Sequence, residues 1–303
     1  MDWTTQLDNW MMEKGLRYDC DEPMSRHTFF RIGGPARRMA YPETEAQLVE
    51  LLEAADRLGV ETFLLGNGSN LLVSDAGLDR LVIETSAAMT GMEEGEDGRI
   101  SASAGVVLAR LADYACRLSL TGLEFAHGIP GTLGGAVCMN AGAYDGEMKQ
   151  VLESVRVWVP GEGVREFSQE ELDLGYRHSV FTDRPELVVL GATVRLQTGE
   201  QEAIRERMRE LMARRKKTQP LEYPSAGSTF KRPVGHFAGG LIEQCGLKGL
   251  TVGGAQVSEK HAGFVINIGG ATCADVMELI RQVQEIVYDR TGVRLEPEVR
   301  IIG

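Results

Sequence analysis

The sequence predicts an α+β protein with two domains, and three observations lead to this prediction. The chain has 303 residues, 43% of them hydrophobic and 25% charged, which suits two globular domains. Short apolar runs alternate with amphipathic helical segments along most of the chain. A strand, a helix and a second strand lead into a glycine-rich loop near residue 66, and α/β folds place ligands at such loops.

Composition and charge argue against several classes of protein. The formal net charge of −12 disfavours a nucleic-acid-binding surface, although a local cluster of Lys and Arg can still hold a small anion. No apolar run approaches the ~20 residues that span a bilayer, and the N-terminus lacks the apolar core of a signal peptide. Five cysteines without a CxxC pair suit reduced thiols, so we expect a cytoplasmic protein without a membrane partner.

Turn residues and apolar spacing define the elements of the first two thirds of the chain. Gly33–Gly34 forms a turn before a short strand, and Thr44 caps a helix that Gly59 ends. Val60–Leu65 is a buried strand that enters the loop Gly66–Asn70. The other predicted elements are helices at 3–16 and 108–119, strands around 39–41, at 71–73 (resuming 60–65), 81–84, 100–104, 151–159 and 187–196, and loops at 89–99 and 172–181.

A charged helix over residues 201–217 is the predicted junction between the domains. Thr272 and Asp275 resemble a capping box at the start of a long helix in the second domain. The elements predicted after the junction are helices at 237–245 and 272–291 and strands at 263–268 and 293–302. We therefore expect one domain over residues 1–200, with lobes at about 20–85 and 86–200, and an α+β domain over residues 201–303.

The stretch of residues 122–144 and the loop Gly66–Asn70 are predicted to clamp the diphosphate of a dinucleotide cofactor. Glycine favours positive φ and lets backbone N–H groups approach a ligand closely, and such groups form anion sites. Gly66–Asn70 matches neither a Walker A sequence nor GxGxxG, and a hairpin turn explains it equally well. For residues 122–144 the alternative is a tight loop between packed elements.

Three polar residues are candidates for chemistry, each with a plain structural alternative. Arg177 lies in a polar loop, where a surface arginine is the default. Ser228 lies in a loop of small residues, where a turn serine often bonds its own backbone. Glu298 is expected within the terminal strand, partly buried or turned to water. The histidines are scattered, without HExxH and without metal-ligand spacing, so no metal site is expected.

Several motifs occur in a fixed order along nearly the whole chain: HTFFRIGGPA, LLGNGSNLLVSDAG, GLEFAHGIPGTLGGAVCMNAGAYDGEM, YRHSVF, AGSTFKRP, LIEQCGLKG, GGAQVS and LEPEVRIIG. Together they resemble the UDP-N-acetylenolpyruvoylglucosamine reductase (MurB) family. The N-terminal part is similar to the FAD-binding domain of the vanillyl-alcohol-oxidase (PCMH) type, and the C-terminal part resembles the α+β substrate domain of these reductases. The short segment from Tyr176 to Val194 resembles the shorter type, which lacks a tyrosine-loop insertion.

The resemblance implies an NADPH-dependent FAD reductase that converts UDP-N-acetylglucosamine enolpyruvate to UDP-N-acetylmuramate in peptidoglycan precursor synthesis. It implies that Ser228 donates a proton to the substrate carbon, and that Arg177 and a protonated Glu298 stabilise the enolate. Substrate contacts are implied for Tyr176, Lys231 and Arg232. The residues implied to bind FAD are Gly66, Asn67, Gly68, Ser69, Asn70, Gly128, Ile129, Pro130, Gly131, Thr132, Gly134, Gly135 and Ala136.

Two other functions stay open at this point. One is an oxidase on the same flavin fold, with oxygen as the electron acceptor. The other is a flavin- or nucleotide-binding module without catalysis. We further expect a monomer or a weak homo-oligomer, non-covalent binding of FAD, and no nucleic-acid partner.

Overall fold

The computed structural model describes residues 2–303, and the chain forms two compact units. Unit 1 contains the segment up to Cys20 together with Arg38–Asn67 and Arg80–Ala213. Unit 2 contains Asp21–Arg37, Gly68–Asp79 and Arg214–Gly303. Two short segments from the first third of the chain therefore cluster with the C-terminal part. The domain division that we expect after residue 200 stays a prediction.

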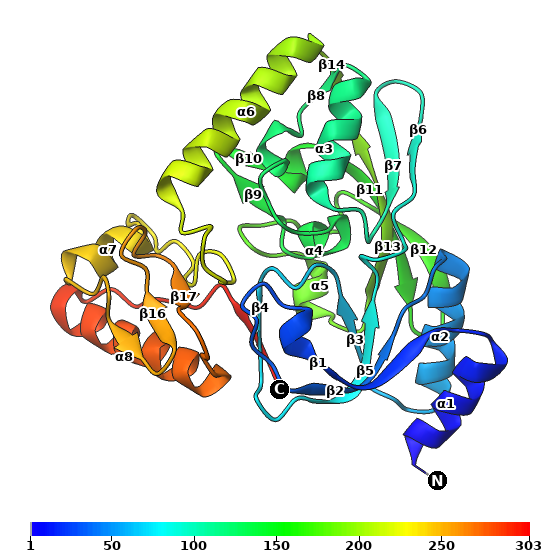
Figure 1. Cartoon of the computed structure of the whole chain (residues 1–303). Helices are drawn as coiled ribbons and strands as arrows, with labels where there is room; N and C mark the ends of the chain where they lie inside the picture. Colours follow the sequence, from blue (N-terminus) through cyan, green and yellow to red (C-terminus); the bar gives the residue numbers. More distant parts are fainter. Residues whose placement is uncertain (1) are drawn as a thin grey trace. The chain divides into compact units, whose positions relative to one another are not determined.

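The larger sheet of unit 1 is antiparallel, with strand order β12-β11-β13-β7-β6 (Figure 1). Its strands are β6 (Met92–Glu94), β7 (Arg99–Ser103), β11 (Leu152–Val159), β12 (Gly163–Ser168) and β13 (Val188–Arg195). Two helices, α3 (Leu108–Arg117) and α4 (Leu133–Cys138), contribute to the same buried core as this sheet. The glycine-rich stretch thus contains a short helix that packs on β13.

A second core in unit 1 forms around α1 (Trp3–Glu13) and α2 (Glu45–Arg57), which contact each other. As predicted, Thr44 caps α2, because its side chain accepts a hydrogen bond of 3.2 Å from the Gln47 N–H. The strand β3 pairs in parallel with β5. The sheet order is β1-β2-β5-β3, with bounds β1 (Tyr18–Pro23), β2 (Pro35–Ala40), β3 (Thr62–Leu65) and β5 (Leu78–Glu84).

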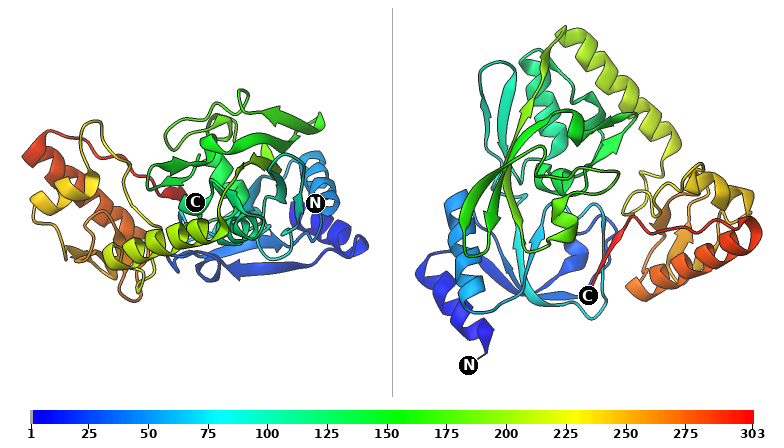
Figure 2. Two further views of the ribbon diagram at one scale, coloured as in Figure 1. Left: turned by 90° about the horizontal axis from the view of Figure 1, so that it is seen from above. Right: turned by 180° about the vertical axis from the view of Figure 1, so that it is seen from behind.

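Unit 2 packs two helices on a small antiparallel sheet of order β15-β16-β17 (Figure 2). The long helix α8 begins with a capping box of Thr272 and Asp275, which confirms that prediction. The C-terminal strand β18 then pairs in parallel with β4. The bounds in this unit are β4 (Leu71–Val73), α7 (Ala238–Gln244), β15 (Thr251–Val252), β16 (Ala255–Val257), β17 (Val265–Asn267), α8 (Cys273–Thr291) and β18 (Arg300–Ile302).

The remaining elements are short, apart from α6, which is the charged helix predicted at residues 201–217. No helix in the described part of the chain has the length and apolarity that crossing a membrane requires. The bounds are η1 (Met24–Arg26), β8 (Leu120–Thr121), η2 (Glu124–Ala126), β9 (Gly142–Ala143), β10 (Gly146–Glu147), η3 (Met148–Gln150), α5 (Val180–Asp183), β14 (Gln197–Thr198) and α6 (Gln201–Thr218).

Two predicted strands and two predicted loops differ from the structure. Residues 71–73 do not resume the strand of residues 60–65, because β4 pairs with β18 in another sheet. The expected strand 293–302 is regular only over residues 300–302, and Pro297, which lacks an N–H, interrupts any continuous ladder before it. The predicted loops 89–99 and 172–181 contain β6 and the start of α5, respectively.

Candidate active site

In unit 1 the first half of the Gly66–Asn70 loop packs directly against the second glycine-rich loop. A Cβ atom on Gly66 would overlap the Oγ1 atom of Thr132, which is itself buried. The side-chain amide of Asn67 donates a hydrogen bond of 2.7 Å to the Pro130 carbonyl. The two segments predicted to hold one cofactor are therefore neighbours, although more than 60 positions separate them in the sequence.

The glycines of α4 serve two different purposes. Gly134 is buried, and a Cβ there would lie 3.0 Å from the Ala104 Cβ, so this glycine allows α4 to pack closely on the turn that follows β7. Gly135 is exposed, and its Cβ would meet only the Thr132 Oγ1, at 3.7 Å. Neither takes a positive φ, so a left-handed backbone is not the reason for glycine at either position. Gly135 leaves an open backbone surface, as a ligand that approaches the main chain requires.

The second half of the first loop belongs to unit 2. Gly68 has φ 60° and leaves no room for a side chain next to the His27 carbonyl, so it needs to be glycine for two reasons. The Asn70 side-chain amide donates a hydrogen bond of 3.1 Å to the Glu298 carbonyl. The Asn70 carbonyl in turn accepts one of 3.0 Å from the Arg300 N–H. The loop is thus fixed to the C-terminal segment that carries Glu298.

Ser228 and Glu298 come together in unit 2 on two paired segments. The Glu298 N–H donates 2.8 Å to the carbonyl of Thr229, the residue after Ser228. The buried Thr229 hydroxyl accepts a hydrogen bond of 2.9 Å from the Val265 N–H, which anchors this segment to β17. Ser228 itself is exposed, and among residues 2–303 its hydroxyl has no hydrogen-bond partner. The alternative of a turn serine bonded to its own backbone is therefore not supported.

Arg177 lies in unit 1 on a tight turn, which we call the arginine turn (residues 175–178). Gly175 and His178 exchange two backbone hydrogen bonds, of 3.1 and 3.3 Å, across this turn. Arg177 adopts φ 54°, which is uncommon for a residue with a side chain. Its Nη2 donates 3.2 Å to the Gly142 carbonyl, and its guanidinium lies 5.3 Å from the centroid of the Tyr176 ring. Arg177 as a whole residue is half-buried.

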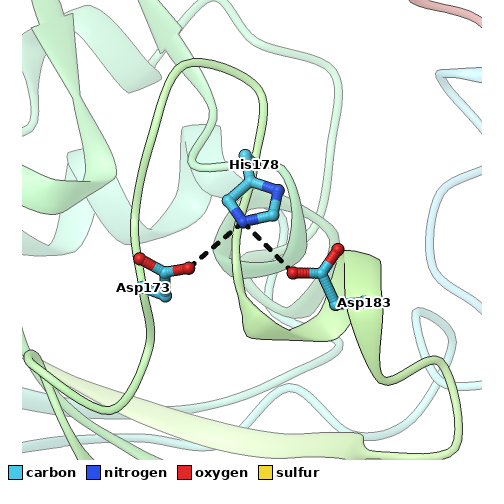
Figure 3. A group of neighbouring side chains, drawn as sticks. All are labelled: Asp173, His178 and Asp183. Carbon is cyan, nitrogen blue, oxygen red and sulfur yellow. Dashed lines mark hydrogen bonds and ion pairs between the residues drawn. The ribbon is translucent and has the colours of Figure 1, made fainter.

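Figure 3 shows three side chains, one in the arginine turn and two that flank it in sequence, that could together hold a cation. The Nε2 atom of His178 lies 3.4 Å from Asp173 Oδ2 and 3.6 Å from Asp183 Oδ2. The three potential ligand atoms lie within 4.8 Å of one another. Both carboxylates are exposed, and hydrogen bonding of the imidazole explains the arrangement without a metal. The sequence missed this cluster because its spacing matches no metal-binding motif.

The remaining predicted substrate contacts lie in unit 2. Lys231 donates its backbone N–H to the Glu296 carbonyl at 2.8 Å, and its Nζ lies 3.5 Å from the exposed Glu296 carboxylate. The Arg232 guanidinium stacks 4.0 Å from the centroid of the Phe237 ring, which is 66% exposed. Sequence reasoning also missed two buried, hydrogen-bonded polar residues near the candidate residues: Thr229 in unit 2 and Asn140 in unit 1. In the sequence, Thr229 is marked only by its place next to Ser228, and Asn140 only by its place within the glycine-rich stretch.

Comparison with known proteins assigns both parts of the chain. Residues 36–168 match the family model of an FAD binding domain. Residues 219–302 match the model of the UDP-N-acetylenolpyruvoylglucosamine reductase C-terminal domain. The reductase from Caldanaerobacter subterraneus subsp. tengcongensis is 47% identical over 97% of this chain and 96% of its own length. The Clostridium perfringens reductase is 49% identical over 93% and 92%, respectively.

This chain belongs to the UDP-N-acetylenolpyruvoylglucosamine reductase family. The solved reductase structure from Thermus caldophilus resembles it with a TM-score of 0.81 and 37% identity, over 95% of this chain and 99% of that one. The predicted family, the FAD-binding and C-terminal parts of the α+β fold, and FAD and NADPH as cofactors are confirmed. The prediction of a reductase in peptidoglycan synthesis is confirmed with them, in preference to an oxidase or a non-catalytic module.

The predicted site residues are distributed over both units of the chain. Of the three predicted catalytic residues, unit 2 holds Ser228 and Glu298 on adjacent segments, and unit 1 holds Arg177. The predicted FAD-binding residues are also divided, with Gly66, Asn67 and those within 128–136 in unit 1 and Gly68–Asn70 in unit 2.

Proposed function

We propose that this reductase reduces the enolpyruvyl ether of UDP-N-acetylglucosamine with Ser228 as the proton donor and with Glu298 and Arg177 as the groups that stabilise negative charge. One observation carries the proposal. The Glu298 backbone is bonded on one side to Thr229, next to Ser228, and on the other side to Asn70 of the predicted FAD loop. A proton donor, a carboxyl group and a cofactor loop are thus held by one hydrogen-bonded unit.

The residues of unit 1 fit the diphosphate of FAD. The exposed backbone at Gly135 and the tight packing of Gly66 on Thr132 leave main-chain groups that a side chain would otherwise cover. Backbone N–H groups of this kind bind phosphate oxygens without a fixed charge nearby, which suits a chain with net charge −12. When bound, FAD supplies the hydride, taken from NADPH, that is added to the terminal vinyl carbon of the substrate.

Three side chains then stabilise the negative charge of the reduced substrate and supply its proton. Hydride addition leaves negative charge on the carbon beside the carboxylate, which spreads into that carboxylate as an enolate. The Arg177 cation and a hydrogen bond from protonated Glu298 are suited to stabilise charge that grows in the transition state. The Ser228 hydroxyl donates its proton to the enolate carbon. A hydroxyl is a weak acid, so only a strongly basic acceptor such as this carbon makes the transfer favourable.

The proposal also includes substrate contacts, the oligomeric state and the location in the cell. Lys231, Arg232 and Tyr176 offer two cations and an aromatic ring, groups that suit the diphosphate and the uracil of a nucleotide sugar. The roles of these three residues stay predictions. A monomeric or weakly oligomeric state, a cytoplasmic location and the absence of a nucleic-acid partner also stay predictions.

The two half-reactions test the proposed function directly. Anaerobic NADPH should bleach the yellow flavin of the purified protein, and UDP-N-acetylglucosamine enolpyruvate should restore it. A sugar nucleotide without the enolpyruvyl group, UDP-N-acetylglucosamine, is the matched control and should not. Rapid reoxidation by oxygen alone, with no response to the enolpyruvyl nucleotide, would contradict the proposal.

A further inference from the structure

Asn140 is a buried polar residue in unit 1 that the proposed chemistry does not use. Its side chain is 1% exposed, and its backbone has φ 41°, a conformation that asparagine tolerates better than most residues. The side-chain oxygen accepts a hydrogen bond of 2.8 Å from the Lys149 N–H. The side-chain nitrogen donates to the Gly175 carbonyl at 2.9 Å and to Glu147 Oε2 at 3.1 Å. Every polar atom of this side chain is therefore in use.

The contact with Gly175 is the important one, because Gly175 is the first residue of the arginine turn. Two further contacts tie the same region to the segment around Asn140. The buried Ser179 hydroxyl donates 2.6 Å to the Cys138 carbonyl, and the Lys149 Nζ donates 3.0 Å to the Leu174 carbonyl. The arginine turn is thus held on both sides by the end of α4 and the chain that follows it.

We infer that Asn140 is the positioning residue for Arg177, an inference that rests on the proposed role of Arg177. A turn with a non-glycine residue at positive φ persists only where the surroundings hold it in place. The cation stabilises the transition state only from a fixed position, because a displacement of about 1 Å costs on the order of 10²-fold in rate. Asn140 supplies this restraint by linking the arginine turn to Lys149 and Glu147.

The variant Asn140→Asp tests the inference with little change in shape. The carboxylate keeps the acceptor for the Lys149 N–H but loses both donors and places an oxygen against the Gly175 carbonyl and Glu147. We expect NADPH to reduce the flavin at the wild-type rate. Reoxidation by the enolpyruvyl nucleotide should slow by about 10²-fold, because only this step needs the Arg177 charge in place.

A double-mutant cycle with Arg177→Ala separates a positioning role from a general structural one. If Asn140 acts through Arg177, the double variant reoxidises no more slowly than Arg177→Ala alone. Thr193→Val is the matched control, because it removes a hydrogen bond to Ser101 in the sheet of the same unit. Its effect should add to that of Arg177→Ala. Additive effects of Asn140→Asp and Arg177→Ala would overturn the inference.

Lys149→Met provides a gentler variant should Asn140→Asp fail to fold. Lys149 is exposed, so the substitution removes the bond to the Leu174 carbonyl without creating a buried defect. We expect a smaller slowing of reoxidation, which again disappears in the Arg177→Ala background. If Arg177→Ala itself reoxidises normally, the proposed function of Arg177 fails. If Arg177→Ala is slow while Asn140→Asp and Lys149→Met are normal, only the inference about Asn140 fails.

Discussion

The side-chain amide of Asn70 holds the backbone carbonyl of Glu298 at 3.1 Å, across 228 positions of sequence. This hydrogen bond joins a residue of the predicted FAD loop to the predicted acidic residue. It lies next to the parallel pairing of β4 with β18, which begins with Arg300 opposite Leu71. The C-terminal strand therefore places the backbone of Glu298 relative to the predicted FAD loop.

Replacing Ser228 with alanine should separate the two half-reactions. Reduction of the flavin by NADPH should be unchanged, because it needs no proton from Ser228. Reoxidation by the enolpyruvyl nucleotide should fall ~10²–10⁴-fold, the usual contribution of a general acid. Stopped-flow absorbance of the flavin measures both steps. Ser225→Ala, in the same loop, is the control and should behave as wild type. Unimpaired reoxidation in Ser228→Ala would exclude Ser228 as the acid.

The activity of variants at Glu298 should depend on whether the new side chain can donate a hydrogen bond. Glu298→Gln keeps a donor of similar length, so it should retain more activity than Glu298→Ala. For the alanine variant we expect a loss in kcat on the order of 10²–10³-fold, as for removal of one donor from a charge-stabilising site. Both variants keep the backbone bonds to Asn70 and Thr229. Glu296→Gln, at an exposed carboxylate two residues away, is the control. Equal losses in all three variants would contradict a specific role for Glu298.

Gly135→Ala tests where the cofactor lies. The added methyl has only an ordinary contact with Thr132, and alanine favours a helix over glycine by ~0.5–1 kcal/mol. The flavin-free protein should therefore be at least as stable as wild type. Binding of FAD should weaken about 10-fold or more, equivalent to ~1.4 kcal/mol, if the diphosphate lies on this backbone. Flavin fluorescence titration measures the affinity. Gly240→Ala in α7, with its nearest contact at 3.7 Å, should leave it unchanged. Full affinity in Gly135→Ala would place the diphosphate elsewhere.

His261 should make the stability of unit 2 depend on pH. Burial lowers the pKa of its imidazole below the ordinary value of 6.5, and the neutral Nδ1 accepts a hydrogen bond from the Gly263 N–H. Because the folded pKa is depressed, the contribution is present above pH 6.5 and is lost as the pH falls through the folded value. Urea unfolding between pH 8 and pH 5 (roughly the range in which histidine titrates) should show decreasing stability at the acid end. His261→Asn should flatten this dependence, and His236→Asn, at an exposed histidine, should not.

Much of the fold and of the site could be predicted from local patterns in the sequence. Thr44 and Thr272 correctly predicted the starts of two helices, because a capping side chain bonds a backbone N–H only three positions further along the chain. The motif around Ser228 and the glycine-rich stretch identified the family before any fold was known. Gly134 and Gly135 looked alike in that stretch, however, and only packing showed that one contacts Ala104 and the other faces outward.

By itself, the sequence determined the helices, most strands, the glycine-rich loops and the residues that could perform the chemistry. Only the tertiary structure decided that β4 pairs with β18 rather than resuming β3, that Glu298 precedes its strand, and that Asn140 supports the arginine turn. The reason is physical. Helix spacing, caps and turns depend on neighbours along the chain, whereas strand pairing and buried side-chain hydrogen bonds depend on partners brought together by the packing of the whole unit.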